Sequence, residues 1–283
     1  MGLFSGLEMF GFKNENMQVY ETETEAAVSE EKVAKKDAQV TIKEEEYLFP
    51  KTHECPVCYE KFKSLAVRAG KLRSVGQDDD LRPLYREMDP IKYDAIVCPH
   101  CGYAALSRYF DRMMPHQGKI LRTEVKSKFK GMQISDDMYS YDEALLRYKM
   151  VLMCDVVGGV KVSRRAYSCL KLGWVIRGKI EKEGPNLSPQ ELEELHSQEM
   201  ECIQNAYDGY VKALSNEPFP MSGMDEQTVL CLVAELAFKL EKYRESLVLV
   251  SQIVGKRDVS SRIKDKALML KDKIRAEIKG ENN

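Results

Sequence analysis

The feature that most constrains this chain is a pair of Cys-x-x-Cys motifs. Cys55 and Cys58 form the first motif, Cys98 and Cys101 form the second, and 39 residues lie between them. Each motif lets two thiolates point to the same side of one tight turn, so the two motifs together supply four sulfur ligands. Four sulfurs suit Zn²⁺ in tetrahedral geometry, with Zn–S distances of roughly 2.3 Å. The spacing therefore predicts one structural metal site that clamps two distant turns together.

The residues beside the cysteines indicate turns of the zinc-ribbon type. Pro56 and Pro99 stiffen the two turns, and Gly102 permits the positive φ that such a turn requires. Tyr59 stands at the position equivalent to Gly102 and lacks this freedom, so the first turn is expected to be atypical.

Short elements are expected around the motifs, in a zinc-ribbon-like module with following helices over residues 47–134. Three aspartates at 78–80 mark a turn, because they lack the spaced ligands and the glycine of a calcium loop. An insertion around residues 77–90 lengthens the connection between the motifs. The patterns predict strands at 62–75 and 93–97, then helices at 104–114 and 119–129 on either side of Pro115.

Other chemistries compete for the four cysteines. Four thiolates also hold a single iron or an iron–sulfur cluster, so iron stays open beside zinc. A thiol redox enzyme is a weaker hypothesis, because a thioredoxin-like site needs only one Cys-x-x-Cys at a strand–helix junction. A closed four-cysteine site leaves no open position for a substrate. The chain also lacks a phosphate loop, a Gly-x-Ser-x-Gly motif and a helical histidine pair, so we predict no enzymatic activity.

The remaining candidate ligands are expected to be bystanders. Two histidines lie within two residues of a cysteine, but four cysteines already complete a tetrahedral shell. Single cysteines on helical patterns are usually small buried hydrophobes. These residues are His53, His100, Cys154, Cys169, Cys202 and Cys231.

Residues 1–46 are predicted to form an acidic disordered leader. Positions 13–46 contain ten acidic residues, five lysines and few large apolar side chains. Residues 1–12 are apolar but lack the basic start and cleavage site of a secretory signal, and Gly6 departs from the myristoylation pattern. They are either a free end or a short docking segment. Without an export signal a cytoplasmic location is expected, and no apolar run approaches the ~20 residues of a membrane span.

Residues 135–283 have helical patterns almost throughout. Ser140 and Ser188 are predicted helix N-caps, each with a glutamate three residues later. Tyr141 and Tyr243 lie 102 residues apart, which is three periods of a 34-residue tetratricopeptide repeat. A tetratricopeptide-like helical array is favoured over an ordinary helical bundle. The predicted fold class is therefore mainly α, with a small zinc-ribbon-like β module followed by this array.

A group of basic residues offers a second function class, nucleic-acid binding by the ribbon. Such binding would depend steeply on salt, because it releases counterions from phosphates. The simpler interpretation is a solvated basic surface that faces the acidic leader. The candidate residues are Arg68, Lys71, Arg73, Lys126 and Lys128.

Several segments carry a resemblance to a known family. They are Cys55-Pro56-Val57-Cys58, Phe62-Lys63, Arg68-Ala69-Gly70-Lys71-Leu72-Arg73, Asp94 to Ala104, Tyr141-Asp142-Glu143-Ala144-Leu145 and Leu170-Lys171-Leu172-Gly173-Trp174. These segments resemble the bacterial family called domain of unknown function 2225. The resemblance runs from about residue 49 to the C-terminus and omits the acidic leader. It implies a bacterial, cytoplasmic protein and supplies no reaction.

These observations favour a zinc-binding interaction or scaffold protein. Helical arrays present extended concave surfaces that suit protein segments, so we expect a protein or peptide partner on residues 135–283. Nucleic-acid binding is the alternative, and thiol redox catalysis is less favoured than either.

Overall fold

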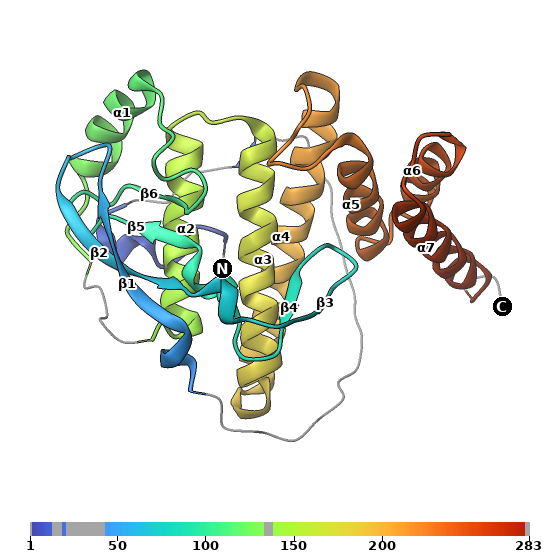
Figure 1. Ribbon diagram of the computed structural model, residues 1–283, viewed down its shortest axis with the longest axis horizontal. Coiled ribbons are helices and arrows are strands. Elements are labelled where there is room, and N and C mark those ends of the chain that lie inside the picture. Colours follow the sequence, from blue (N-terminus) through green and yellow to red (C-terminus); the bar gives the residue numbers. More distant parts are fainter. Residues whose placement is uncertain (1, 13–18, 21–42, 133–137, 281–283) are drawn as a thin grey trace.

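The structure is a computed structural model that describes residues 2–12, 19–20, 43–132 and 138–280. The fold is mainly α, as the sequence predicts, with a small β part near the cysteine motifs (Figure 1). The helices are α1 (Pro115–Leu121), continued by a π-helical turn (Arg122–Lys126), α2 (Tyr141–Val157), α3 (Val162–Glu183), α4 (Pro189–Asn216), α5 (Glu226–Lys239), α6 (Tyr243–Gly255) and α7 (Ser261–Gly280).

The β part consists of antiparallel hairpins. Within the described residues each sheet has two strands, and the hairpins follow one another along the chain. Glu54 pairs with Lys61 and Val97 pairs with Ala104, so each cysteine motif occupies the turn at the tip of a hairpin. The strands are β1 (Leu48–Glu54) with β2 (Lys61–Val67), β3 (Ser74–Gln77) with β4 (Pro83–Tyr85), and β5 (Ala95–Val97) with β6 (Ala104–Leu106).

The capping residues predicted from the sequence mark the starts of two long helices correctly. The Ser140 hydroxyl accepts a hydrogen bond from the Glu143 amide and begins α2, and Ser188 with Glu191 forms a full capping box at the start of α4. Helices α2, α3 and α4 pack side by side, whereas α5, α6 and α7 follow beyond α4 (Figure 1). The last three share a separate apolar cluster that includes Ala234, Val250 and Leu270. The tetratricopeptide-like character of this region stays a prediction.

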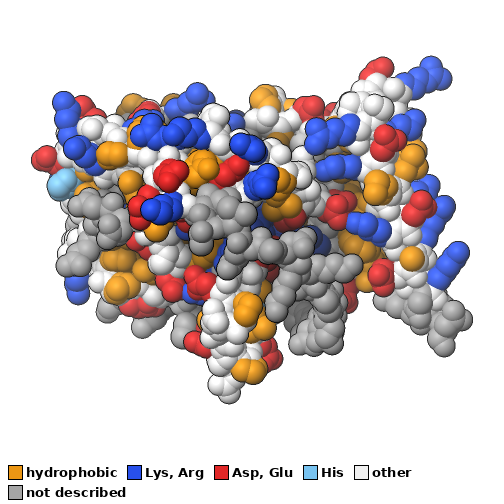
Figure 2. Space-filling view, turned by 60° about the horizontal axis from the view of Figure 1, so that its bottom comes forward, with side chains coloured by type: hydrophobic (Ala, Val, Ile, Leu, Met, Phe, Trp, Pro, Cys, Tyr) orange, Lys and Arg blue, Asp and Glu red, His pale blue; other side chains and the backbone are white. Residues whose placement is uncertain are grey.

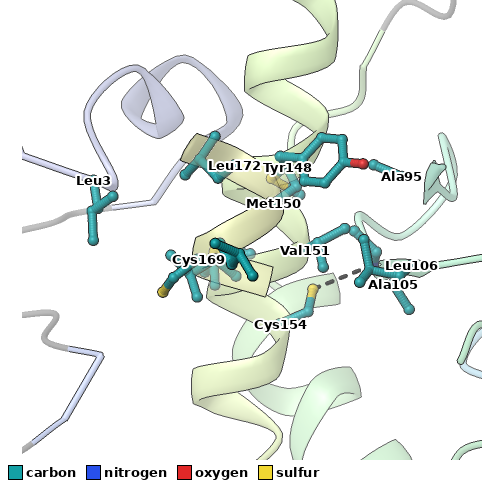
Figure 3. Packing of buried hydrophobic residues seen from close by; sticks show 14 of the residues in the cluster. Leu3, Ala95, Ala105, Leu106, Tyr148, Met150, Val151, Cys154, Cys169 and Leu172 are labelled. Carbon is teal, nitrogen blue, oxygen red and sulfur yellow. Dashed lines mark hydrogen bonds between the residues drawn. The ribbon is translucent and has the colours of Figure 1, made fainter. Parts of the chain in front are cut away.

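The predicted helix at residues 104–114 is wrong. Ala104–Leu106 is strand β6, which pairs with β5 and lies fully buried against α2. Pro115 does not separate two helices but begins α1, where its fixed φ and missing N–H are tolerated. Figure 3 shows the labelled β5 and β6 residues Ala95 and Leu106 facing α2.

The prediction of a disordered leader is wrong for residues 2–12. This segment contains a 3-10 turn (Leu7–Phe10), and its large apolar side chains are buried in the main core. The rest of that prediction falls mostly on residues 13–18 and 21–42, which lie outside the described residues. The buried side chains of the segment are Leu3, Phe4, Leu7, Phe10 and Phe12.

One apolar core joins the cysteine hairpins to the long helices. It includes Cys98 and Leu106 from the hairpins and Leu152 and Leu172 from α2 and α3. The predicted boundary between residues 134 and 135 lies outside the described residues. The metal-ligand candidates are therefore embedded in the same apolar cluster as the helices.

The β3–β4 turn is fastened to the helices by ion pairs. Asp80 is fully buried and accepts hydrogen bonds from Arg177 of α3 and Lys239 of α5. Arg82 forms a two-pronged hydrogen bond with Glu181 of α3, with N–O distances of 2.9 and 2.7 Å. The insertion between the two cysteine motifs thus reaches across α3 to α5 (Figure 1).

Candidate metal centre

The two cysteine turns have the same backbone geometry. In the first, the Tyr59 amide donates to the Cys55 carbonyl at 2.8 Å, and the Cys55 amide donates to the Glu60 carbonyl at 3.0 Å. In the second, the Gly102 amide donates to the Cys98 carbonyl at 2.9 Å, and the Cys98 amide donates to the Tyr103 carbonyl at 2.8 Å. Each hairpin therefore closes on a tight turn that places its two cysteines three residues apart, at the tip of the hairpin.

The four thiols converge on one point. The Cys55 and Cys101 sulfurs lie 3.5 Å apart, and the Cys58 and Cys98 sulfurs lie 3.6 Å apart. All four sulfurs lie within 4.8 Å of one another. A tetrahedron with Zn–S distances of roughly 2.3 Å has S–S edges of about 3.8 Å, so this set fits a four-sulfur metal ion. The structure brings together all four predicted ligands.

Burial and charge make a cation necessary if all four sulfurs are to ionise. Cys55, Cys98 and Cys101 are fully buried and Cys58 is partly buried. Hydrogen bonds from Cys101 and Cys98 lower the pKa of the Cys55 thiol, whereas the hydrogen bond with Cys55 raises the pKa of Cys101. One thiolate thus suppresses ionisation of its neighbours, and a bound divalent cation would reverse that effect.

The second turn rests on α2 and on a phenylalanine. The Cys154 thiol of α2 accepts a hydrogen bond from the Ala104 amide of β6 at 3.3 Å, drawn as the dashed line at Cys154 in Figure 3. The same thiol donates to the Gly102 carbonyl at 3.6 Å. A Cβ atom at Gly102 would lie 2.6 Å from the Phe129 ring, so only glycine fits there. The sequence prediction of Cys154 as a buried residue is correct, but its hydrogen bonds to the turn were not predicted.

The first turn is held by Arg122. Its guanidinium donates to the Val57 carbonyl at 3.1 Å from the π-helical turn that follows α1. No local sequence pattern indicates this contact, because the two residues are 65 positions apart.

Tyr59 takes the backbone conformation that its counterpart Gly102 takes. Its φ is 64°, against 72° for Gly102, and its side chain is 67% exposed. The first turn is therefore atypical in its residue, as predicted, and regular in its geometry.

We predict that Tyr59→Gly stabilises the metal-loaded protein by about 0.5–1 kcal/mol. A left-handed conformation costs a non-glycine residue about 1–2 kcal/mol, and glycine loses roughly 0.5–1 kcal/mol more backbone entropy on folding. Urea unfolding with metal present measures the difference, and Tyr59→Ala, which keeps the Cβ, is the control. An unfolding midpoint below that of the unmodified protein would show that the tyrosine ring contributes more than the strain removes.

The two nearby histidines lie outside the sulfur cluster. His53 is buried, stacks on Phe62 and meets the edge of Phe110, and burial lowers its pKa. His100 is exposed at the second turn. Neither is grouped with the cysteines among the candidate ligands of the described residues. The other predicted bystanders, Cys169, Cys202 and Cys231, are buried as expected.

The five basic residues proposed for nucleic acid are all exposed, and three of them have partners within the chain. Arg68 donates to the Leu48 carbonyl at 3.2 Å and lies over the Phe49 ring, with 5.1 Å to its centroid. Acidic and basic side chains are interspersed on the face shown in Figure 2. Arg73 pairs with Glu87, Lys128 pairs with Glu124, and Lys71 and Lys126 stand at the ends of the 3-10 turn Ala69–Lys71 and of the π-helical turn.

Comparison with known proteins gives a family and no individual relative. No helix within the described ranges is long and apolar enough to cross a membrane. No match to the chain was found among the curated proteins or among the solved structures. The family model DUF2225, described as an uncharacterized protein conserved in bacteria, matches residues 48–274. That match includes all four cysteines and most of the helical part, so the chain belongs to the bacterial family DUF2225.

Proposed function

We propose that this protein is a zinc-binding, non-catalytic interaction protein that acts in the cytoplasm. The sulfur cluster supports the metal: four cysteines complete a tetrahedral shell and leave no position for a substrate, as in structural zinc sites. Buried thiols without disulfide partners suit a reducing compartment.

The metal assignment is tested by elemental analysis of the purified full-length protein. The expected result is one zinc per chain and no stoichiometric iron. Cobalt loading should give the absorption of a tetrahedral thiolate site. Stoichiometric iron, or less than a tenth of a metal ion per chain after growth with added zinc, would contradict the proposal.

One observation carries the interaction role: the helices bind a short apolar segment of this same chain. Residues 2–12 lie against α2, where the Lys149 ammonium donates to the Ser5 carbonyl at 2.9 Å and to its hydroxyl at 3.3 Å. On α4, burial raises the pKa of Glu201, and the nearby Leu3 backbone partly offsets that rise. The helical surface therefore has the shape and polar anchors to hold an apolar peptide, which supports a protein partner of similar chemistry.

We predict that a labelled peptide of residues 2–12 binds in trans to full-length protein carrying Phe10→Ala and Phe12→Ala. These changes weaken the segment attached in cis, which otherwise competes at high effective concentration. Fluorescence anisotropy should show saturable binding to the double variant and at least tenfold weaker apparent binding to the unmodified protein. The same peptide with Phe10 and Phe12 replaced by alanine is the control. Equal binding of the two peptides, or none, would refute peptide recognition by this surface.

A further inference from the structure

A line of aromatic contacts connects the metal centre to residues 2–12. The Phe129 ring lies against the backbone of Gly102, the residue after the ligand Cys101. The same ring meets Phe10 and Phe12, with centroid distances of 6.1 and 6.5 Å from Phe129. One side chain thus contacts both the second cysteine turn and the apolar segment.

Backbone contacts reinforce the same line. The Lys130 amide donates to the Phe10 carbonyl at 3.1 Å. A Cβ atom at Gly11 would lie 2.2 Å from the Lys128 carbonyl oxygen, so the two backbones approach as closely as glycine allows. The segment is therefore seated on residues 128–130, and these residues take their position partly from the second cysteine turn.

The position of the second turn depends on its ligands. Cys98 and Cys101 belong to a hairpin of three-residue strands, and a short isolated hairpin has little stability of its own. A bound metal holds the second turn through Cys98 and Cys101 and ties it to the first turn through Cys55 and Cys58, whereas without metal the clustered thiols lose the cation that holds them together. Movement of Gly102 removes the surface on which the Phe129 ring rests.

The docked state of residues 2–12 is also sensitive to the loss of a few contacts. Eleven residues must be ordered to bury five large apolar side chains, and the entropy lost is comparable to the free energy gained by burial. A segment whose ordering entropy nearly equals its burial free energy is released when part of its contact surface is lost.

We propose that residues 2–12 are a detachable cover whose docking is controlled by the metal centre through Phe129. With metal bound, the segment lies over the apolar surface of α2 and α4. Loss of the metal displaces Phe129, frees the segment and uncovers that surface. This inference rests on the proposed function, since it describes how the proposed peptide-binding surface is covered and uncovered.

Hydrogen–deuterium exchange of the full-length zinc-loaded protein tests the coupling. The amides of residues 2–12 should be protected with zinc and should exchange at least tenfold faster after chelation, while the middle of α4 keeps its protection. Protection of residues 2–12 that is the same with and without zinc overturns the proposal. So does loss of protection that occurs only together with α4.

Two variants test the contact line without removing the metal. In Gly102→Ala the new methyl group collides with Phe129 from the side of the metal turn, and in Phe129→Ala the ring itself is absent. Both should speed exchange of residues 2–12 at least tenfold while one zinc per chain is retained. Phe238→Ala, which removes a ring from the separate α5–α7 cluster, should leave this exchange unchanged. If both variants hold zinc and residues 2–12 stay protected, the coupling is refuted.

The outcomes separate this inference from the proposed function. A protein that binds zinc and the peptide in trans, but shows no effect of zinc on residues 2–12, refutes the coupling and leaves the interaction role standing. A protein without zinc, or one that does not bind the peptide, refutes the proposed function itself.

Discussion

Replacing Cys98 by serine is expected to abolish stoichiometric metal binding and to unfold the hairpins β1–β2 and β5–β6. A structural zinc site contributes an apparent binding free energy on the order of 10 kcal/mol, which is as large as the whole stability of many domains. Cys98 is fully buried in the core that the hairpins share with α2 and α3. We therefore also expect the thermal unfolding midpoint of the helical part to fall by more than 10 °C, about what a loss of several kcal/mol produces.

The matched control for this change is Cys231→Ser. Cys231 is also a buried cysteine, but it lies on α5 in the second apolar cluster, away from the four sulfurs. This variant should keep one zinc per chain and lose only about 1 kcal/mol for its buried hydroxyl. Metal analysis and circular dichroism measure the metal content and the folding of the two variants. Full metal occupancy in Cys98→Ser would contradict the assignment of four cysteine ligands.

Replacing Asp80 by alanine is expected to destabilise the protein by about 3 kcal/mol, because it removes a fully buried carboxylate that accepts charge-assisted hydrogen bonds from the partly buried Arg177 and Lys239. The Asp80 side chain is 0% exposed and pairs with Arg177 and Lys239 at 2.7 Å each. Asp79→Ala is the control in the same turn: Asp79 is 57% exposed and pairs with the half-exposed Lys273, so its loss should cost less than about 1 kcal/mol. Urea unfolding of the two variants compares them directly. Equal losses would show that burial does not distinguish these ion pairs.

The contribution of Asp80 depends on pH. Burial opposes its ionisation, but hydrogen bonds and the charges of Arg177 and Lys239 outweigh burial and hold the pKa of Asp80 well below its usual range. An aspartate whose pKa is depressed in the folded state stabilises the protein above its unfolded pKa of about 3.9, and that stabilisation is lost as pH falls toward the folded pKa. The difference in unfolding free energy between the unmodified protein and Asp80→Asn should therefore be largest above about pH 5 and shrink below about pH 4. A difference that stays constant from pH 7 to 3 would contradict this role.

The parts of this molecule that depend on local sequence could be predicted, and the parts that depend on distant partners could not. The spacing of Cys55 and Cys58, the caps at Ser140 and Ser188, and the need for Gly102 all act within a few residues, and the structure shows each of them. Strand β6 was missed because its three residues are fixed by pairing with β5 and by burial against α2, which override the helical pattern of the following residues.

Long-range contacts explain the two larger surprises. The aspartates at 78–80 form a turn, as their sequence predicts, but Arg177 and Lys239 lie 97 and 159 positions from Asp80. The apolar residues 2–12 had no visible partner in their own neighbourhood, because Lys149 lies 144 positions from Ser5. A short apolar run beside an acidic stretch carries no signal that says which distant surface buries it.

The placement of residues 2–12 has a consequence for synthesis on the ribosome. The segment leaves the ribosome long before the helices that cover it, since Glu201 of α4 follows Leu3 by 198 positions. At about 5–20 residues per second, its apolar side chains wait about 10–40 s for their binding surface. During that interval the cysteines of both motifs emerge and can capture their metal, while the earliest apolar residues of the described chain are still exposed. We therefore expect residues 2–12 to form an aggregation-prone hydrophobic segment during translation until α4 is complete.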